Sequence, residues 1–302
     1  MTVFERLPAN PLSQEDSGHR FDADRRWAAS IQLGFEARQE QKSSITRMTR
    51  IRHKGPLRVQ RPFYPEGKTG CCHVYLLHPP GGLVSGDSLG IDVTVGQGAH
   101  TLLTTPAAAK LYKADRNGVA WGQHTGLKVA TGGTLEYLPQ ETLAFNGSKG
   151  EQTTTIELES GAKCIGWEVL ALGRPVGDLP FVTGHLEQRF SLSLEGKPLW
   201  LERQILDPTH PRFQGKWGQG GATVQATLWV VGLEDEPGAI EAIREQLPES
   251  KHWAVTRRRG VVLLRYLGNE RNEAWATCQH AWEVLRPMLT GQPAVIPRIW
   301  LT

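Results

Sequence analysis

Residues 127 to 138 read Leu-Lys-Val-Ala-Thr-Gly-Gly-Thr-Leu-Glu-Tyr-Leu, and this stretch contains two short strand patterns joined by a turn. Apolar and polar residues alternate on both sides of the Gly-Gly pair, as they do along a half-buried strand. Gly132 and Gly133 supply the positive-φ positions that a tight connection between antiparallel strands needs. The stretch therefore predicts a strand, a turn and a second strand.

The same pattern recurs along most of the chain. Period-two alternation returns at residues 154–158, 190–194 and 224–230, and 33 glycines and 19 prolines punctuate the 302 residues. A regular alternation of strands and helices is absent, which argues against a parallel α/β sheet. We therefore expect a mainly β, helix-poor fold with many turns.

Two segments in the C-terminal half have helical periodicity instead. Between residues 270 and 289, apolar side chains recur at three- and four-residue steps, which predicts an amphipathic helix packed on a sheet. A shorter helix is expected from Pro237, which suits a first helical turn, to Pro248.

Composition bounds the domain organisation and the location. Residues 1–26 are polar and aperiodic, so we expect a flexible leader followed by a single β-rich domain over residues 27–302. No export signal precedes this region, no apolar run approaches the roughly 18 residues of a membrane span, and four scattered cysteines do not form a disulfide framework. We expect a cytoplasmic protein that does not enter a membrane.

The formal net charge is only +3, and the short basic clusters lack interleaved aromatic residues. The sequence therefore predicts no nucleic-acid binding. A solvated strand end or a charged protein interface is the simpler interpretation of these clusters.

Gly86-Asp87-Ser88-Leu89 spells the motif of GDSL-type serine esterases. Asp207 and His210 have the spacing with which a carboxylate orients a general-base imidazole for the nucleophile Ser88. However, the residues after Leu89 alternate like a strand, whereas GDSL hydrolases carry the serine on a strand-to-helix turn, and no Gly-x-Asn-Asp block is present. The esterase is kept as the alternative function.

Cys71-Cys72-His73 invites a metal interpretation. On a strand, Cys71 and His73 project from one face while Cys72 faces the core with Val74 and Leu76. Two ligands do not make a structural zinc site, and no second Cys or His pair follows at metal spacing. Ordinary buried cysteines and a weak, exchangeable site for a borderline metal both stay open.

A longer set of blocks carries a family resemblance. The blocks are Gly55-Pro-Leu-Arg-Val-Gln-Arg-Pro-Phe-Tyr-Pro-Glu66, His73 to Asp87, Thr104 to Tyr112, Leu135 to Thr142, Trp167 to Pro175, Leu285-Arg-Pro, Leu289-Thr-Gly and Pro297-Arg-Ile-Trp-Leu-Thr302. In this order they resemble the urease accessory protein UreD family, called UreH in some systems, and they cover most of residues 27 to 302. The leader and the Cys71-Cys72 doublet depart from the family pattern.

The resemblance implies an assembly function rather than an enzyme. Family members are chaperone-like scaffolds that bind urease apoprotein together with UreF and the GTPase UreG and support GTP-dependent nickel insertion. The implied fold consists of β-helix-like stacked sheets with about two α-helices. No tightly bound cofactor is implied, only transient nickel.

A scaffold that hands over nickel needs oxygen and imidazole ligands that are too few for tight coordination. We expect such a weak transit lining from polar residues inside the apolar, Pro- and Gly-rich family blocks: His78, Ser85, Asp87, Glu141 and Glu168. Each residue also has a structural explanation. Asp87 and Ser85 can cap a turn, His78 can bond to a carbonyl, and the two glutamates can pair with Arg or Lys.

Overall fold

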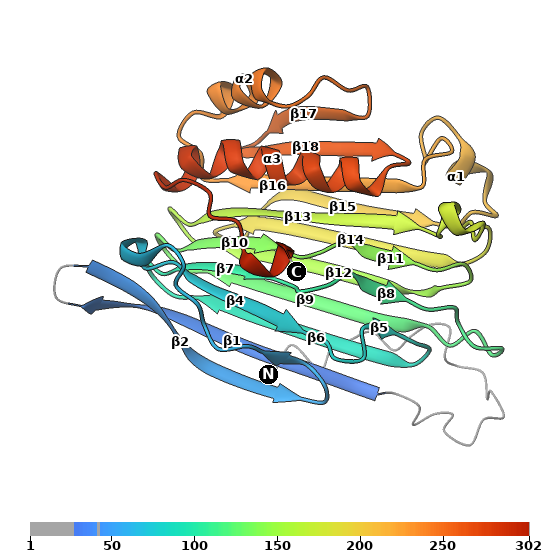
Figure 1. Cartoon of the computed structure of the whole chain (residues 1–302), viewed down its shortest axis with the longest axis horizontal. Helices are drawn as coiled ribbons and strands as arrows, with labels where there is room; N and C mark the ends of the chain where they lie inside the picture. The colour runs from blue at the N-terminus through green and yellow to red at the C-terminus, as the bar shows by residue number, and fades with distance from the viewer. Residues whose placement is uncertain (1–26, 41–42, 302) are drawn as a thin grey trace.

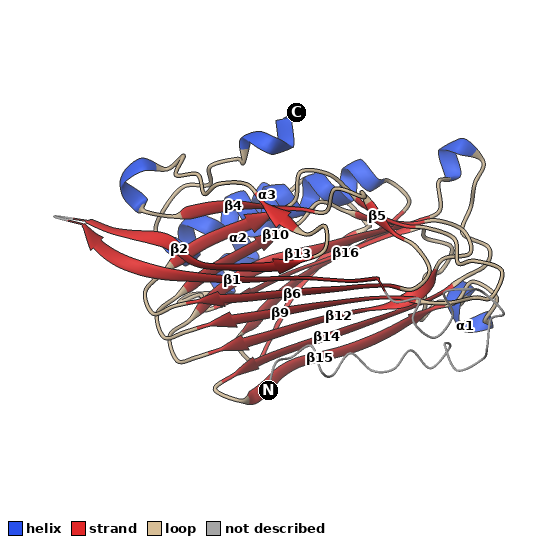
Figure 2. Cartoon of the chain, turned by 90° about the horizontal axis from the view of Figure 1, so that it is seen from below, coloured by secondary structure: helices blue, strands red, loops and turns tan. Residues whose placement is uncertain are grey.

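Two β-sheets lie face to face in the computed structural model, which describes residues 27–40 and 43–301 (Figures 1 and 2). The two longer helices cover the outer face of one sheet, as Figure 2 shows. The predicted leader, residues 1–26, lies outside the described residues, so its role stays a prediction. None of the helices in the described part of the chain has the length and apolar character of a membrane span.

The first sheet has seven strands, and no helix of residues 27–40 and 43–301 covers its outer face. Its order is β15 (Lys197–Leu206), β14 (His185–Leu194), β12 (Lys149–Leu158), β9 (Trp121–Val129), β6 (Asp87–Val95), β1 (Trp27–Glu40) and β2 (Ser43–Lys54). From β1 to β14 all neighbours pair in parallel, and the two edge strands, β2 and β15, pair antiparallel.

The second sheet has eleven strands and carries the helices. Its main order is β17 (Trp253–Arg258), β18 (Val261–Gly268), β16 (Val224–Val231), β13 (Lys163–Leu172), β10 (Thr134–Leu138), β7 (His100–Thr104), β4 (Cys72–Leu77) and β3 (Arg58–Val59), with β5 (Gly82–Leu83), β8 (Ala109–Leu111) and β11 (Thr142–Ala144) paired beside it. Strands β4, β7, β10 and β13 are parallel, whereas β13, β16, β18 and β17 are antiparallel.

Consecutive strands in the middle of the chain alternate between the two sheets. The turns at residues 96–99, 130–133 and 159–162 carry the chain from β6 to β7, from β9 to β10 and from β12 to β13. Gly98 and Gly132 in these turns have φ of 63° and 65°. The prediction of a positive φ is confirmed for Gly132 and wrong for Gly133. Each strand then pairs with the equivalent strand of the next coil, which gives the β-helix-like stacking implied by the family resemblance.

The prediction that these tight turns join antiparallel neighbours is therefore wrong for the middle of the chain. Parallel strands need a crossover connection, which is usually a helix. Here a strand of the opposite sheet serves as that connection, so parallel pairing occurs without helices. The prediction is correct for β14 and β15, a true antiparallel hairpin that turns at Gly196.

The main core fills the space between the sheets. Alternate side chains of each strand point inward and are almost completely buried, among them Ile31, Val93, Leu103, Leu127, Leu135, Ile156 and Leu192. Period-two alternation is thus explained by one buried and one exposed face. This confirms the mainly β, helix-poor class.

A second core lies between the eleven-stranded sheet and helices α2 (Glu236–Gln246) and α3 (Arg271–Thr290). The Asp235 side chain accepts a hydrogen bond from the Gly238 amide and caps α2, while α3 ends at Gly291 with φ of 72°. Both helices confirm the sequence prediction. The short α1 (Pro211–Gln214) and the 3₁₀ turns η2 (Gly67–Thr69), η3 (Pro175–Gly177) and η4 (Arg298–Leu301) were not predicted.

The inter-sheet core should dominate stability. Leu103 on β7 is fully buried, so Leu103→Ala is expected to lower the free energy of unfolding by about 2–5 kcal/mol through lost burial and a cavity. Leu201 on β15 is 67% exposed, and Leu201→Ala is the matched control, with an expected change within about 0.5 kcal/mol. Denaturant unfolding of both variants measures the difference, and equal losses would contradict the assignment of the core.

Candidate functional site

His78 and Asp87 lie where β4 ends and β6 begins. Burial lowers the pKa of His78 and raises the pKa of Asp87, because burial disfavours the charged form of each group. The charge of each side chain acts on the other and opposes both shifts. The structure thus places two of the five residues predicted to line a transit path at the two ends of the loop between β4 and β6.

Ser85 and Asp87 also fix the loop between these strands. Asp87 Oδ2 accepts a hydrogen bond of 2.9 Å from the Val84 amide, and Ser85 Oγ accepts one of 2.8 Å from the Asp115 amide. Both side chains are buried. These bonds agree with the structural explanation offered for the two residues, and the transit role stays a prediction.

Glu141 lies apart from this group, near the start of α3. Its side chain is buried, with one carboxylate oxygen 3.6 Å from Arg271 Nε. The other oxygen, Oε2, is buried without a hydrogen-bond partner among the described residues. A buried carboxylate oxygen without a partner is costly, so this atom is available to a ligand.

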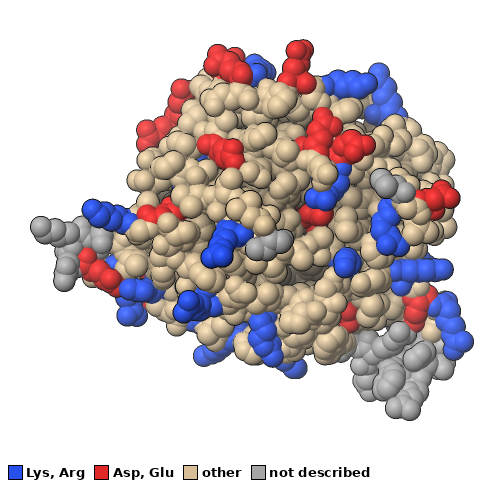
Figure 3. Space-filling view, viewed as in Figure 1, with Lys and Arg blue, Asp and Glu red and all other residues tan. Residues whose placement is uncertain are grey.

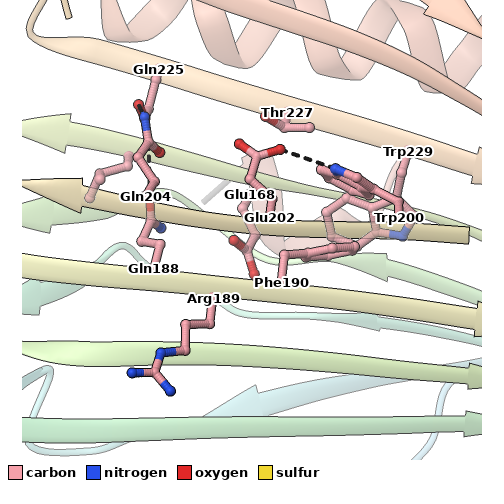
Figure 4. A pocket seen from close by; sticks show the side chains of 11 residues that line it. Glu168, Gln188, Arg189, Phe190, Trp200, Glu202, Gln204, Gln225, Thr227 and Trp229 are labelled. Carbon is pink, nitrogen blue, oxygen red and sulfur yellow. Dashed lines mark hydrogen bonds between the residues drawn. The ribbon is translucent and has the colours of Figure 1, made fainter. Parts of the chain in front are cut away.

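Glu168 on β13 faces the space between the two sheets, as Figure 4 shows. Thr154 Oγ1 donates a hydrogen bond of 2.5 Å to its carboxylate. Burial raises the pKa of Glu168, and the charge of nearby Glu202 raises it further. Neither Lys nor Arg is paired with Glu168 in the described part of the chain, contrary to the structural explanation that the sequence offered for it.

The Glu168 carboxylate borders a cavity of about 40 Å³ between the sheets, which has both polar and apolar walls and is called here the Glu168 cavity. Its walls come from β13 and β16 on one side and from β14 and β15 on the other; the residues are Glu168, Leu170, Gln188, Arg189, Phe190, Trp200, Glu202, Gln204, Gln225, Thr227 and Trp229. A single water molecule needs about 10–15 Å³ of cavity volume. The cavity therefore has room for a few waters or for one partly hydrated ion.

Neutral amides supply most of the polar lining. Gln225 Nε2 donates to Gln188 Oε1 at 2.8 Å and to Gln204 Oε1 at 2.7 Å, so three strands are linked by one amide network. The second carboxylate, Glu202, accepts hydrogen bonds from Trp200 and Arg265. Because Glu202 is already paired, Glu168 is the carboxylate of this cavity that lacks a cationic partner.

A second polar group lies under α3 and was not predicted. This Arg286 cluster comprises Glu66, His73, His100, Glu136 and Arg286. Arg286 Nε donates to both oxygens of Glu136, at 2.9 and 3.0 Å, and Nη2 donates to Glu66 Oε1 at 2.6 Å. His100 Nε2 lies 2.7 Å from Glu136 Oε1, and His73 Nε2 lies 2.7 Å from Glu66 Oε1. Three segments far apart in sequence, residues 66–73, His100 and Glu136, are thus tied to one helix.

The electrostatics of the Arg286 cluster favour its ionised form. Burial opposes ionisation of Glu66, but hydrogen bonds from His73 and Arg286 outweigh it and lower the pKa of Glu66 to about 2. Burial likewise opposes ionisation of Glu136, and His100, Arg286 and Trp282 together lower its pKa. The carboxylates in turn raise the pKa of Arg286. Since the side chains of the ion pairs are 0–2% exposed, neither carboxylate can exchange its partner for water.

Two features of the sequence indicate part of the Arg286 cluster. The expected strand face is confirmed, because Cys71 and His73 both point toward the helices while Cys72 packs in the inter-sheet core with Val74. Arg286 stands four residues after Trp282 on the buried face of α3, where a charge needs a partner. The sequence does not identify the carboxylate that pairs with Arg286, because Glu66 is 220 positions away.

Acid titration should reveal the contribution of the Glu66 ion pair to the free energy of unfolding. A carboxyl with a pKa of about 2 in the folded state and an ordinary value of 4.5 contributes stability that is complete above about pH 5 and lost as the pH falls toward 2, on the order of 3 kcal/mol. The free energy of unfolding of Glu66→Gln should therefore fall less steeply than that of the wild type between pH 5 and pH 2. The exposed Glu157 is the control, and Glu157→Gln should follow the wild type. Parallel curves for all three proteins would contradict the ion-pair assignment.

The esterase residues do not assemble. Ser88 lies within β6 and not on a strand-to-helix turn, and Asp207 directly follows β15. These two strands are four positions apart in the same sheet, which corresponds to roughly 19 Å. His210 Nδ1 accepts a hydrogen bond from the Arg212 amide and caps α1. The stacked-sheet fold and this separation do not support the GDSL alternative.

Comparison with known proteins agrees with the fold and with the absence of an assembled triad. A family profile described as "UreD urease accessory protein" matches residues 28–301. The chain is 72% identical to urease accessory protein UreD of Marinobacter nauticus and 66% identical to UreD 1 of Psychrobacter cryohalolentis, over the full length of both chains in each case. It is 42% identical to UreD 2 of Brucella anthropi, over 91% of this chain and 98% of that protein.

The chain therefore belongs to the UreD family of urease accessory proteins. This membership supports a role in urease maturation, and the relatives are named as accessory proteins rather than as enzymes.

Proposed function

We propose that this chain is a non-catalytic, cytoplasmic scaffold that binds urease apoprotein together with UreF and the GTPase UreG and supports GTP-dependent insertion of nickel into urease. The observation that carries the proposal is the family match over residues 28–301, together with relatives that are named urease accessory proteins. Binding to nucleic acids or membranes is not part of the proposed role.

The distribution of polar groups supports passage of nickel rather than storage. Nickel is bound by imidazole and carboxylate ligands, and its affinity rises with the number of ligands a site offers. His78 with Asp87, Glu141 alone and Glu168 with its amides each offer one or two such ligands. In residues 27–40 and 43–301, none of these residues belongs to a group of three or more His, Cys, Asp or Glu that could hold an ion. Sites of this kind bind a metal weakly and release it readily.

The Glu168 cavity is the best candidate for a transient nickel-binding site. Its carboxylate is the strongest ligand there. Among the described residues, the amide oxygens of Gln188 and Gln204 each accept only one hydrogen bond, from Gln225, and are neutral oxygen ligands that suit a hydrated ion. Because the pKa of Glu168 is raised by burial, protonation of this group competes with metal binding. A proton and a cation therefore exclude each other at this carboxylate, and protonation favours release of the ion.

Charge on the surface supports docking of protein partners. Figure 3 shows Lys and Arg gathered toward the edge formed by β1 and β2, while Asp and Glu gather over α2 and the start of α3. On β2 the exposed residues Arg50, Arg52 and Lys54 form no ion pair within the described part of the chain. Unpaired surface charge of one sign accelerates and orients association with a partner of the opposite sign. We interpret this edge as a charged protein interface.

Nickel transfer is tested by Glu168→Ala and Asp87→Ala. If these carboxylates line the transit path, urease matured with either variant should contain less nickel and show urease activity lower by on the order of tenfold. Glu157→Ala on the outer face of the seven-stranded sheet is the matched control and should support full activation. Formation of the complex with UreF and UreG is checked for each variant by size-exclusion chromatography. Normal nickel content with an intact complex would reject the lining role.

Partner binding and the lack of catalysis are tested separately. The chain should co-purify with UreF and UreG, and urease activation by this complex should require hydrolysable GTP. A fluorophosphonate probe should leave Ser88 unlabelled. Labelling that is lost in Ser88→Ala, together with ester turnover, would replace the scaffold by the esterase.

A further inference from the structure

The strongest set of metal ligands in the described part of the chain lies outside the proposed transit path. Glu66, Cys71 and His73 form one group, and Cys71, His100 and Glu136 form a second, with the ligand atoms of each group within 4.8 Å of one another. The two groups share the Cys71 sulfur, so they surround one buried region beneath α3.

The spacing of these atoms suits a single ion after small movements. Bonds from a divalent ion to N, O or S ligands are about 2.0–2.3 Å long, so two atoms on one ion can be up to about 4.6 Å apart. The set contains thiol, imidazole and carboxylate, the ligand types that bind nickel, cobalt and zinc. On ligand number alone, this region would bind such an ion more tightly than the Glu168 cavity.

His73 is arranged like a metal-bound histidine. Its Nε2 contacts Glu66, and its Nδ1 is completely buried without a hydrogen-bond partner. An imidazole that bonds a carboxylate through one nitrogen and leaves the other free is the usual arrangement around metal ions. The Cys71 thiol is also buried among these groups, and burial and the two carboxylates keep it protonated.

A cation already occupies the centre of the region, and it is Arg286. Its guanidinium spans the two carboxylates, 2.6 Å from Glu66 and 2.9 Å from Glu136, and also donates to the Pro293 carbonyl. The guanidinium therefore takes up the negative charge that would attract a divalent ion, and it repels any ion placed beside it. The side chain is fully buried, so it cannot leave without moving α3.

We propose that Arg286 is a built-in cation that keeps a buried divalent-metal site closed. Its guanidinium stands in for a metal ion between Glu66 and Glu136, so that Cys71, His73 and His100 do not capture one. The benefit to the protein rests on the proposed function: a chain that passes nickel through weak ligands must not hold a tight site that traps it. The closed site itself does not depend on that function.

Removal of the guanidinium should open the site. Arg286→Gln and Arg286→Met remove the charge, whereas Arg286→Lys keeps a cation and is the matched control. Titration of the purified full-length variants with Co²⁺ is expected to show one site per chain, about 10- to 100-fold tighter than any in the wild type, with a thiolate-to-Co²⁺ charge-transfer absorption. On binding, the Cys71 proton passes to solvent as the sulfur–metal bond forms. The absorption should vanish in Arg286→Gln/Cys71→Ser and be absent from the wild type and from Arg286→Lys.

Each outcome of the titration decides the proposal. Folded Arg286→Gln and Arg286→Met that bind Co²⁺ no better than the wild type would overturn it, as would the thiolate absorption in the wild type. If neither variant folds alone, both are purified with and without Co²⁺. Folding restored by the metal supports the closed site, and no restoration overturns it.

A second measurement separates this inference from the proposed function. Urease matured with Arg286→Gln should contain less nickel than urease matured with the wild type, and the added Cys71→Ser substitution should restore part of the loss. If nickel content is unchanged while Co²⁺ binding appears, the closed site stands and its role in nickel passage is wrong.

Discussion

The contact between Arg286 and Glu136 is the constraint on which the helix-covered half of the molecule depends. Two charged side chains that are completely removed from water must neutralise each other, and a misplaced α3 would leave both buried and unpaired. Trp282, one turn before Arg286, bonds to the same carboxylate, so two successive turns of the helix are fixed to β10. Glu66 extends the anchor to the loop before β4.

This anchor also separates the two polar environments on which the proposals rest. The eleven-stranded sheet carries the Arg286 cluster on its outer face and the Glu168 cavity on its inner face. Trp167 on β13 packs against Trp275 and Trp300 under α3, while the next residue, Glu168, faces the other sheet. In the Arg286 cluster the two buried carboxylates are paired with a cation, whereas the carboxylate of Glu168 in the inner cavity lacks a cationic partner among the described residues. A metal carrier needs the second environment, and it must prevent the first from competing for the ion.

The sequence predicts the local secondary structure well and the pairing of strands within the sheets poorly. Period-two alternation shows which face of a strand is buried, and helical periodicity locates α2 and α3, because both patterns depend on neighbouring residues. Alternation does not identify the partner strand, so the sequence wrongly predicts antiparallel hairpins where the structure has parallel coils. The same limit applies to the site. His78 and Asp87 are close in sequence and lie at the two ends of one loop, but the walls of the Glu168 cavity come from β14, β15 and β16, which no local pattern connects to Glu168.

The central claim is that this chain gives nickel a protected route into urease. The most direct test is the nickel content of urease after activation in vitro by UreF, UreG and GTP in the presence of excess chelator, with and without this chain. The account predicts that nickel is incorporated only when the chain is present. Equal nickel content in its absence would contradict the account.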